Sequence, residues 1–250
     1  MRFLVLLALV GTAGGFACKG GGGGGNYAPT QTQLPGNLTA GYLVIQPTDM
    51  PEGLGKLGQP SILGADQVRG LFKNTGSSDQ QIDTWQIIAQ IMQSWAAGSN
   101  DRFPAKGPGS MASSATVSQT VEAAHTFFDY SRQALDQGRI AGQTTFVHLT
   151  IVSYEEITQA ALGDEYRFVH VLTQDQDDPI DVEVYWAIWR RGPMVGGIFM
   201  QARTGNVSLD QVTALTTKLD SGMQQALAEA FTPEPSTTAT APGTTPTPSP

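Results

Sequence analysis

The stretch "IDVEVYWAIWRRGPMVGGIFMQA", residues 180–202, decides the fold of this chain. Two sets of side chains alternate along 180–189: Val182, Val184, Trp186 and Ile188 on one side, and Asp181, Glu183, Tyr185 and Ala187 on the other. A period of two with one fully apolar face is typical of an antiparallel strand packed on a core. The turn "RRGP" at 190–193 is too short for a parallel crossover, which needs about a dozen residues. We therefore predict that 194–202 pairs with 180–189 as a hairpin.

More strand-like segments lie upstream of this hairpin. Two of them, 144–152 and 165–173, have the same mixture of β-branched and aromatic residues. The short "QDQDDP" connects the second of these to the hairpin, so it too joins antiparallel neighbours. Further upstream, "MASSATVS" at 111–118 is a strand candidate that follows a loop at 100–110, where two prolines and two glycines occur.

Two segments have the apolar period of helices. The first begins at Ser118 or Thr120 and ends near Gln137, and the second begins at a capping box formed by Ser208 and Gln211. Their apolar stripes are Val121, Ala124, Phe128 and Leu135, with Phe127 beside them, and Val212, Leu215, Leu219, Met223 and Leu227. Strands combined with helices in this order predict an α+β fold, with an antiparallel sheet packed against two or more helices.

The segment 83–97, "DTWQIIAQIMQSWAA", fits either kind of element. A helix would place Trp85, Ile88, Met92 and Trp95 on one face. A strand would place Trp85, Ile87, Ala89 and Ile91 on one face. Periodicity alone does not separate these alternatives. The strands that follow favour a strand.

The two ends of the chain differ in composition from residues 41–230, which we expect to form a single domain. Residues 1–17 have the pattern of a signal peptide, with Arg2, the apolar run "FLVLLALV" and small residues. Residues 18–40 begin with a cysteine, and six consecutive glycines follow shortly after it. Because glycines have no side chains to pack, we predict that this segment is a flexible, Gly-rich tether. Residues 231–250 are rich in Pro and Thr and are predicted to form a disordered tail.

Cys18 is the only cysteine of the chain and directly follows Ala17. This arrangement resembles the bacterial lipobox, whose cysteine is lipidated and becomes the new N-terminus. Gly15 and Phe16 depart from it, since the pattern prefers Leu and then a small residue at these positions. The alternative is a secreted protein that starts with an unmodified cysteine. The lipobox interpretation makes Cys18 the lipidation site and places the domain on the extracytoplasmic face of the cell membrane, anchored by its N-terminal lipid.

Charge limits the partners of the domain. The net charge is −8, only 14% of residues are charged, and the Lys and Arg residues form no cluster. A protein that binds nucleic acid needs a basic surface for the phosphates, so nucleic acid is excluded as a partner. The sequence "GLGKLG" at 53–58 matches a dinucleotide-binding pattern, but Pro51 and Pro60 flank it, so a glycine-rich loop is the better interpretation. We predict no cofactor.

Three short patches of sequence resemble a group of bacterial envelope lipoproteins. They are Asp49-x-Pro51-x-Gly53, "ALGDEYRF" at 161–168 and "IWRRGPMVGGIF" at 188–199, although Pro193 replaces an Asn that is common in the group. The domain of that group is related to the PsbP-like domain and to extracytoplasmic sensor domains of some Ser/Thr kinases. The resemblance implies a PsbP-like sandwich that binds a ligand or partner, such as an apolar small molecule or an envelope protein. It transfers no catalytic residue.

Candidate binding residues are aromatic or acidic. Phe168, Tyr185, Trp186 and Trp189, together with Trp85 and Trp95, either line an apolar pocket or belong to the core. Asp175, Asp177 and Asp178 begin like a calcium-binding loop, but Pro179 interrupts the pattern, and a solvated hairpin loop is the alternative. His148 and His170 fall in neighbouring strand-like segments, but a metal site would need a third ligand.

A catalytic alternative rests on carboxylates. Glu155, Glu156, Asp164 and Glu165 can act as an acid and base of a glycosidase only if the fold brings two of them together. Ion pairing with Arg167 and with the Arg190–Arg191 turn is the other interpretation of these acids. The sequence therefore predicts a non-enzymatic, membrane-anchored binding module, with an envelope hydrolase as the alternative.

Overall fold

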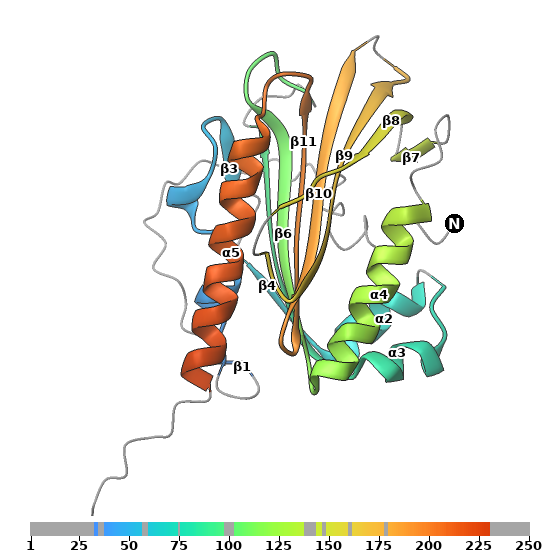
Figure 1. Cartoon of the computed structure of the whole chain (residues 1–250), viewed down its shortest axis with the longest axis vertical. Helices are drawn as coiled ribbons and strands as arrows, with labels where there is room; N and C mark the ends of the chain where they lie inside the picture. Colours follow the sequence, from blue (N-terminus) through green and yellow to red (C-terminus); the bar gives the residue numbers. More distant parts are fainter. Residues whose placement is uncertain are drawn as a thin grey trace, which may run out of the picture.

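The structure of the chain is a computed structural model. It describes residues 33–34, 38–56, 60–74, 76–97, 103–137, 144–146, 149–159, 162–177 and 180–230. The predicted signal peptide, Cys18, most of the tether and the tail at 231–250 lie outside the described residues. Within them, a large antiparallel sheet stands between two helical layers, so the predicted α+β class is confirmed (Figure 1).

The main sheet contains nine strands of the described chain. In chain order they are β3 (Leu54–Lys56), β4 (Ser61–Gly64), β5 (Ile87–Ala97), β6 (Pro108–Ser118), β7 (Thr144–Phe146), β8 (Leu149–Glu156), β9 (Glu165–Asp175), β10 (Asp181–Arg191) and β11 (Met194–Arg203). Across the sheet their order is β3-β5-β6-β11-β10-β9-β8-β7, and β4 also pairs with β5. Every pairing is antiparallel, which confirms the two predicted hairpins around β10.

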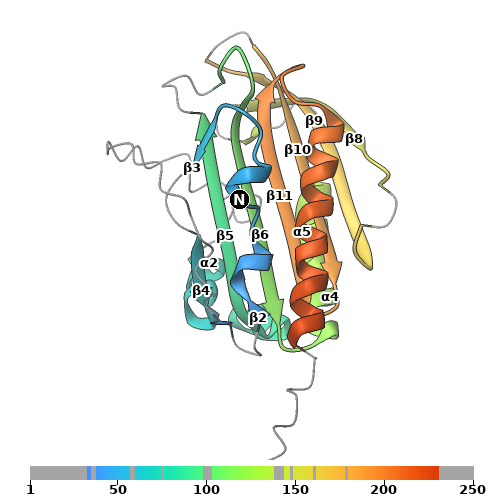
Figure 2. The ribbon, with the colours of Figure 1, turned by 90° about the vertical axis from the view of Figure 1, so that its left-hand side faces the viewer.

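Helices cover both faces of this sheet (Figure 1). The face that we call the α4 face is covered by α2 (Ala65–Asn74), α3 (Asp79–Trp85) and α4 (Val121–Gln137). The opposite face, the α5 face, is covered by α5 (Leu209–Ala230) and by an N-terminal segment beside it (Figure 2). That segment contains the short strands β1 (Gln33–Leu34) and β2 (Leu38–Thr39) and the 3₁₀ turns η2 (Ala40–Leu43) and η3 (Pro47–Asp49).

Strand β10 has buried side chains on both faces of the sheet. Val184 and Trp186 lie in the core of the α4 face, while Tyr185 and Trp189 lie in the core of the α5 face. The sequence pattern identified the first, fully apolar face correctly. It did not predict the burial of the second face, because Glu183 there reads as a solvent-facing residue, yet it is buried. Central strands covered on two sides bury both sets of side chains, whatever their alternation.

Helix starts follow the predicted capping chemistry. At α5 the Ser208 Oγ accepts a hydrogen bond from the Gln211 backbone N–H at 3.2 Å, and Gln211 Oε1 accepts one from the Ser208 N–H at 2.9 Å. At α4 the Thr120 Oγ1 accepts a hydrogen bond from the Ala123 N–H at 3.1 Å. The predicted stripe of α4 needs one correction: Val121, in the first turn, is 52% exposed, because the helix begins beyond the edge of the core.

Three element boundaries differ from the prediction. Segment 83–97 is a strand only from Ile87, because α3 continues to Trp85 and Gln86 reverses the chain with a φ of 44°. The predicted loop at 100–110 ends earlier, since β6 begins at Pro108. The predicted strand at 144–152 is two strands, β7 and β8. Helix α2 was not predicted, because it is only ten residues long and has a glycine, Gly70, in its interior.

Candidate functional site

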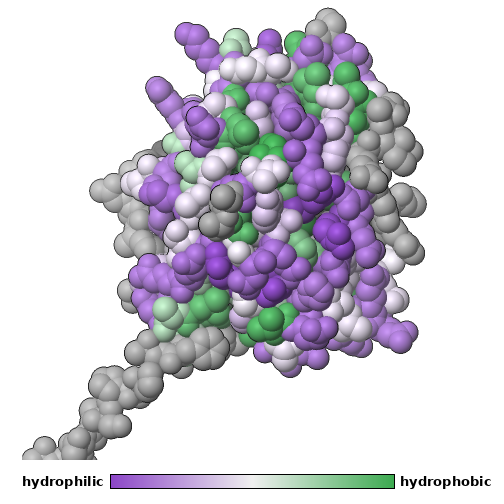
Figure 3. All heavy atoms as spheres, viewed as in Figure 1, coloured by the Kyte–Doolittle hydropathy of each residue, from purple (hydrophilic) through white to green (hydrophobic). Residues whose placement is uncertain are grey.

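The α4 face contains a cavity of about 30 Å³ between α4 and the middle of the sheet. Five elements line it: β5, β6, β10 and β11 from the sheet, and α4 above them. Nine of its ten lining residues are buried, and Ser114 of β6 is the partly exposed one. On the side of the molecule that Figure 3 shows, hydrophobic residues form several separate areas among hydrophilic ones. No single hydrophobic surface area dominates this side of the described chain, so the buried cavity is the candidate site.

The polar lining of this cavity includes an acceptor without a partner. Gln90 is 2% exposed, and its Nε2 donates a hydrogen bond to Thr116 Oγ1 at 3.0 Å. Gln90 Oε1 has no hydrogen-bond partner in the described chain. A buried polar atom left without a partner costs about 1–3 kcal/mol, so Gln90 Oε1 offers binding energy to any donor that enters. The hydroxyls of Ser114 and Ser131 border the same space.

Glycine keeps the cavity open on the side of β11. Gly197 presents no side chain there, and a Cβ at this position would lie 3.1 Å from Ser114 Oγ. An alanine side chain would therefore occupy part of the space. Phe127 of α4 and Trp186 of β10 supply aromatic walls. The chemical character of the cavity is consequently neutral, with hydrogen-bonding groups and apolar walls side by side.

The four aromatic residues predicted to bind a ligand do not face one common space. Trp186 borders the cavity on the α4 face, whereas Phe168, Tyr185 and Trp189 belong to the core of the α5 face. All four are at most 6% exposed. The thickness of the sheet separates Trp186 from the other three, so a single pocket lined by all four is incompatible with the structure. A binding role for Trp186 stays a prediction.

The acids proposed as a catalytic pair are held by basic side chains. Glu165 Oε1 contacts Arg190 Nε and lies 2.7 Å from His125 Nδ1. Asp164 Oδ2 accepts hydrogen bonds from Arg190 Nη1 at 3.0 Å and from the Gly192 N–H at 2.8 Å. These contacts join two of the three sequence patches described above, 161–168 and 188–199, and connect the 162–165 turn to the β10–β11 hairpin.

This ion-pair chain extends to helices on both faces of the sheet. At one end His125 of α4 contacts Glu165, and at the other Arg191 Nε donates to Asp220 Oδ1 of α5 at 3.0 Å. The hydrogen bond to Glu165 raises the pKa of His125, against a smaller opposing effect of burial. Burial would raise the pKa of Glu165, but hydrogen bonds from Arg190 and His125 outweigh it and lower that pKa. The hydrogen bond to Asp220 raises the pKa of Arg191.

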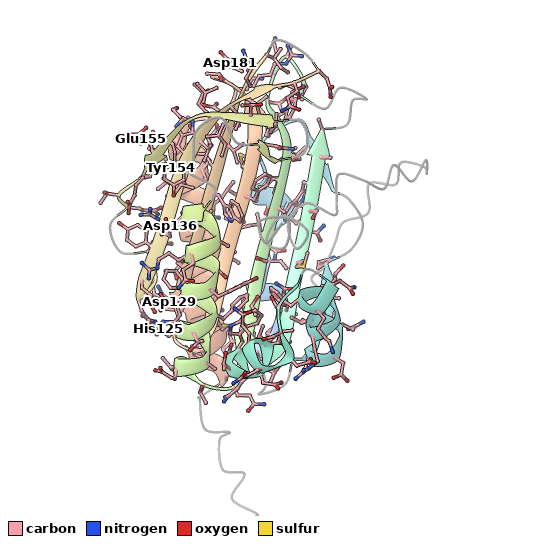
Figure 4. The ribbon with its side chains drawn as sticks, turned by 90° about the vertical axis from the view of Figure 1, so that its right-hand side faces the viewer. His125, Asp129, Asp136, Tyr154, Glu155 and Asp181 are labelled. Carbon is pink, nitrogen blue, oxygen red and sulfur yellow. The ribbon has the colours of Figure 1, made fainter. Side chains whose placement is uncertain are left out.

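A second group of charges connects α4 to the edge of the sheet. Arg167 of β9 donates to Asp136 Oδ1 from Nη2 at 2.7 Å and also contacts Glu156. Figure 4 shows Asp136 on α4, with Tyr154 on the strand β8 beside it. Sequence proximity suggested that Arg167 pairs with Glu165. The structure instead pairs Arg167 with Asp136 and Glu156. Glu155 is exposed, and its Oε2 lies 4.0 Å from His170 Nδ1.

The predicted metal ligands form no metal centre in the described chain. Among the described residues, no group of three or more His, Cys, Asp and Glu side chains is arranged to hold a metal ion. Asp175 is buried, and its Oδ1 accepts a hydrogen bond from the Asp177 N–H at 2.8 Å, so it shapes the β9–β10 turn. His170 instead stacks on Tyr185, with ring centroids 4.5 Å apart. Asp178 and His148 lie outside the described residues.

Cys18, the predicted lipidation site, lies outside the described residues. In the part of the chain that the structure covers, no helix is both long and apolar enough to cross a membrane. The cavity itself could not be located from the sequence, because Gln90, Ser114 and Gly197 come from three different strands. The sequence features that could have indicated a cavity are the hydroxyl residues in the predicted strand 111–118 and the two adjacent glycines in the predicted strand 194–202.

Comparison with known proteins gives a match in fold. No family model matches the sequence, and a search of curated proteins found no similar one. Among solved structures, the extracellular domain of PknH from Mycobacterium tuberculosis is similar, with a TM-score of 0.50 and 11% sequence identity. The match covers 80% of this chain and 100% of that domain. At this identity the similarity shows the fold alone, and it agrees with the predicted α+β class.

Proposed function

We propose that this protein is an extracytoplasmic lipoprotein, anchored to the cell membrane through Cys18, and that its domain is a non-enzymatic module that binds a ligand or partner. The observation that carries the binding role is the unpartnered Gln90 Oε1 at the cavity of the α4 face. The lipobox-like sequence and the fold shared with an extracellular domain support the location.

The arrangement of the carboxylates supports a non-enzymatic role. A glycosidase needs two carboxyl groups that face each other across a substrate, one of them protonated. Here Asp164 and Glu165 accept hydrogen bonds from Arg190, and the pKa of Glu165 is lowered rather than raised. A carboxylate held in its charged form by arginine and histidine is a poor proton donor. Both acids therefore serve better as structural ion pairs than as catalytic groups.

The anchoring part of the proposal is tested by metabolic labelling. Full-length protein and its Cys18→Ser variant are expressed in a bacterial host together with a clickable fatty acid. We expect labelling of the wild type and none of the variant, because Cys18 is the only acylation site of this type in the chain. Equal labelling of the two proteins would contradict the anchor.

The binding part is tested by native mass spectrometry. The full-length Cys18→Ser chain, purified without denaturation, is compared with the same chain carrying Gly197→Ala. We expect a retained small molecule in the first and its loss in the second, because the added methyl group occupies part of the cavity. Retention of the same molecule by both proteins would place binding elsewhere and remove the support for this cavity.

A further inference from the structure

We infer that the cavity on the α4 face is a subsite for the hydroxymethyl group of a neutral polyol or sugar. This inference rests on the proposed binding function and specifies its ligand class. The argument uses three properties of the cavity: the hydrogen-bonding atoms that it offers, the lack of charge in its lining, and its size.

A hydroxyl group matches the hydrogen-bonding atoms of the cavity. Gln90 Oε1 needs a donor, and a ligand hydroxyl supplies one. The oxygen of the same hydroxyl can accept a hydrogen bond, and the Thr116 hydroxyl has a proton to donate, because its Oγ1 already accepts from Gln90 Nε2. Ser114 and Ser131 add two further hydroxyls. A group that both donates and accepts is satisfied here, whereas a carbonyl group would leave Gln90 Oε1 unpaired.

The lining excludes charged groups. None of its ten residues is Asp, Glu, Lys, Arg or His. Transfer of an unpaired carboxylate, phosphate or ammonium into such a buried space costs far more than transfer of a hydroxyl. The nearby arginines do not change this, because Arg190 and Arg191 are engaged with Asp164, Glu165 and Asp220. The ligand group that enters is therefore neutral.

The volume sets the size of the entering group. One water-sized group needs a cavity volume of about 10–15 Å³. A cavity of about 30 Å³ therefore holds two such groups. A CH₂–OH group has two non-hydrogen atoms and fits this space. Its methylene would contact the apolar walls formed by Phe127, Trp186 and Ile188. The rest of the ligand would remain at the partly exposed side, where Ser114 lies.

Glycerol is the probe for this inference, since it has two terminal hydroxymethyl groups and no charge. The isotope-labelled full-length Cys18→Ser chain is titrated with glycerol while the side-chain amide of Gln90 and the indole N–H of Trp186 are followed by NMR. We expect saturable shifts of both signals and none at Trp95, which lies on the opposite face. Acetate and methylammonium, which are smaller than glycerol but carry charge, should leave the Gln90 signal unchanged.

Two pairs of variants locate the binding. Gly197→Ala, which narrows the cavity, should abolish the glycerol shifts, while Gly64→Ala, where a Cβ would meet nothing within 4 Å, should retain them. Ser114→Ala should weaken glycerol binding by about fivefold, the effect of one lost neutral hydrogen bond. Ser113→Ala, its neighbour on the opposite face of β6, should not. Circular dichroism verifies that each variant is folded.

Three outcomes would overturn the inference: glycerol shifts that do not saturate, equal shifts in the Gly197→Ala chain, or equal binding of acetate. A cavity that takes up water alone would give the first of these. If native mass spectrometry finds a retained molecule that Gly197→Ala removes while glycerol has no effect, the polyol class is wrong and the binding function stands. Failure of both experiments removes the binding function as well.

Discussion

The two faces of the sheet use adjacent glycines in opposite ways. On the α5 face, a Cβ at Gly196 would lie 2.7 Å from the Trp189 ring and 2.8 Å from Met223 Sδ. On the α4 face, a Cβ at Gly197 would meet Ser114 Oγ at 3.1 Å and otherwise little. The first glycine is required by dense packing, and the second leaves space. The comparison indicates that, at these two positions, the core of the α5 face is packed more tightly than the core of the α4 face.

The largest effect is expected on the α5 face at Gly222→Ala. A Cβ there would lie 2.0 Å from the backbone oxygen of Tyr42, so the N-terminal segment would have to move away from α5. Overpacking typically destabilises by about 1–3 kcal/mol, and we expect a loss of about 3 kcal/mol here, because a backbone contact cannot relax by side-chain rotation. Urea unfolding measures the loss, with Gly70→Ala as the control, because the control site is helical and open. A change below about 1 kcal/mol would show that the segment is loosely attached.

The direct comparison of the two faces is Gly196→Ala against Gly197→Ala. We expect the first to lose about 2 kcal/mol of stability, because both contacts of the new methyl group are buried side chains. The second should change stability by less than about 1 kcal/mol, since the Ser114 hydroxyl can rotate. Thermal unfolding of the two variants side by side gives the answer. Equal destabilisation would mean that the α4 face is packed as tightly as the other.

A smaller effect is expected from a buried charge of the α5 face. Asp220 has a side chain only 5% exposed and pairs with Arg191. Asp220→Asn weakens this pair and should lower stability by about 1–2 kcal/mol at neutral pH, measured by urea unfolding. Asp79→Asn is the matched control, because its side chain is 54% exposed in its pairs with Arg69 and Lys73, and exposed pairs contribute little. Equal losses would indicate that Asp220 is solvated.

The smallest effect is a pH dependence at the edge of α4. Folding raises the pKa of His125, first through its hydrogen bond to Glu165, above its ordinary value of 6.5. A group whose pKa is raised by folding contributes its full stabilisation of the folded state at pH values below its unfolded-state pKa. This contribution disappears as the pH rises through the folded-state pKa. His125→Gln should therefore lower the thermal midpoint more at about pH 5.5 than at about pH 8.5. A pH-independent difference would contradict the contact with Glu165.

The sequence predicted the parts of the fold that depend on local pattern. The alternation at 180–202 specifies a strand hairpin, and the capping box at Ser208 specifies a helix start. Both depend on local sequence alone, and both are present. Burial of the second face of β10 was missed because it depends on α5, which is more than fifteen residues away in the chain. Helix α2 was also missed, although Val68, Leu71 and Phe72 have the i, i+3, i+4 spacing of a helix face.

The sequence alone identified only single residues of the candidate site. Trp186 was identified as an aromatic candidate, but its neighbours Phe168 and Tyr185 were assigned to the same pocket, although the sheet separates them. An unpaired atom such as Gln90 Oε1 depends on the packing of five elements, and no spacing of residues encodes that. The acids that suggested catalysis were chosen by residue type, and the sequence did not predict that Asp164 and Glu165 share Arg190 as a partner.

Strand β2 and turn η2 of the N-terminal segment lie at the same pole of the domain as the end of α5 (Figures 1 and 2). The Tyr42 hydroxyl donates to Glu229 Oε1 at 2.8 Å, close to the last turn of the helix. Leu38, Leu43 and Ile45 are buried along this path. Detachment of the segment would expose these side chains together with the part of the α5 core that they cover, so the first described turns of the domain contribute to its stability.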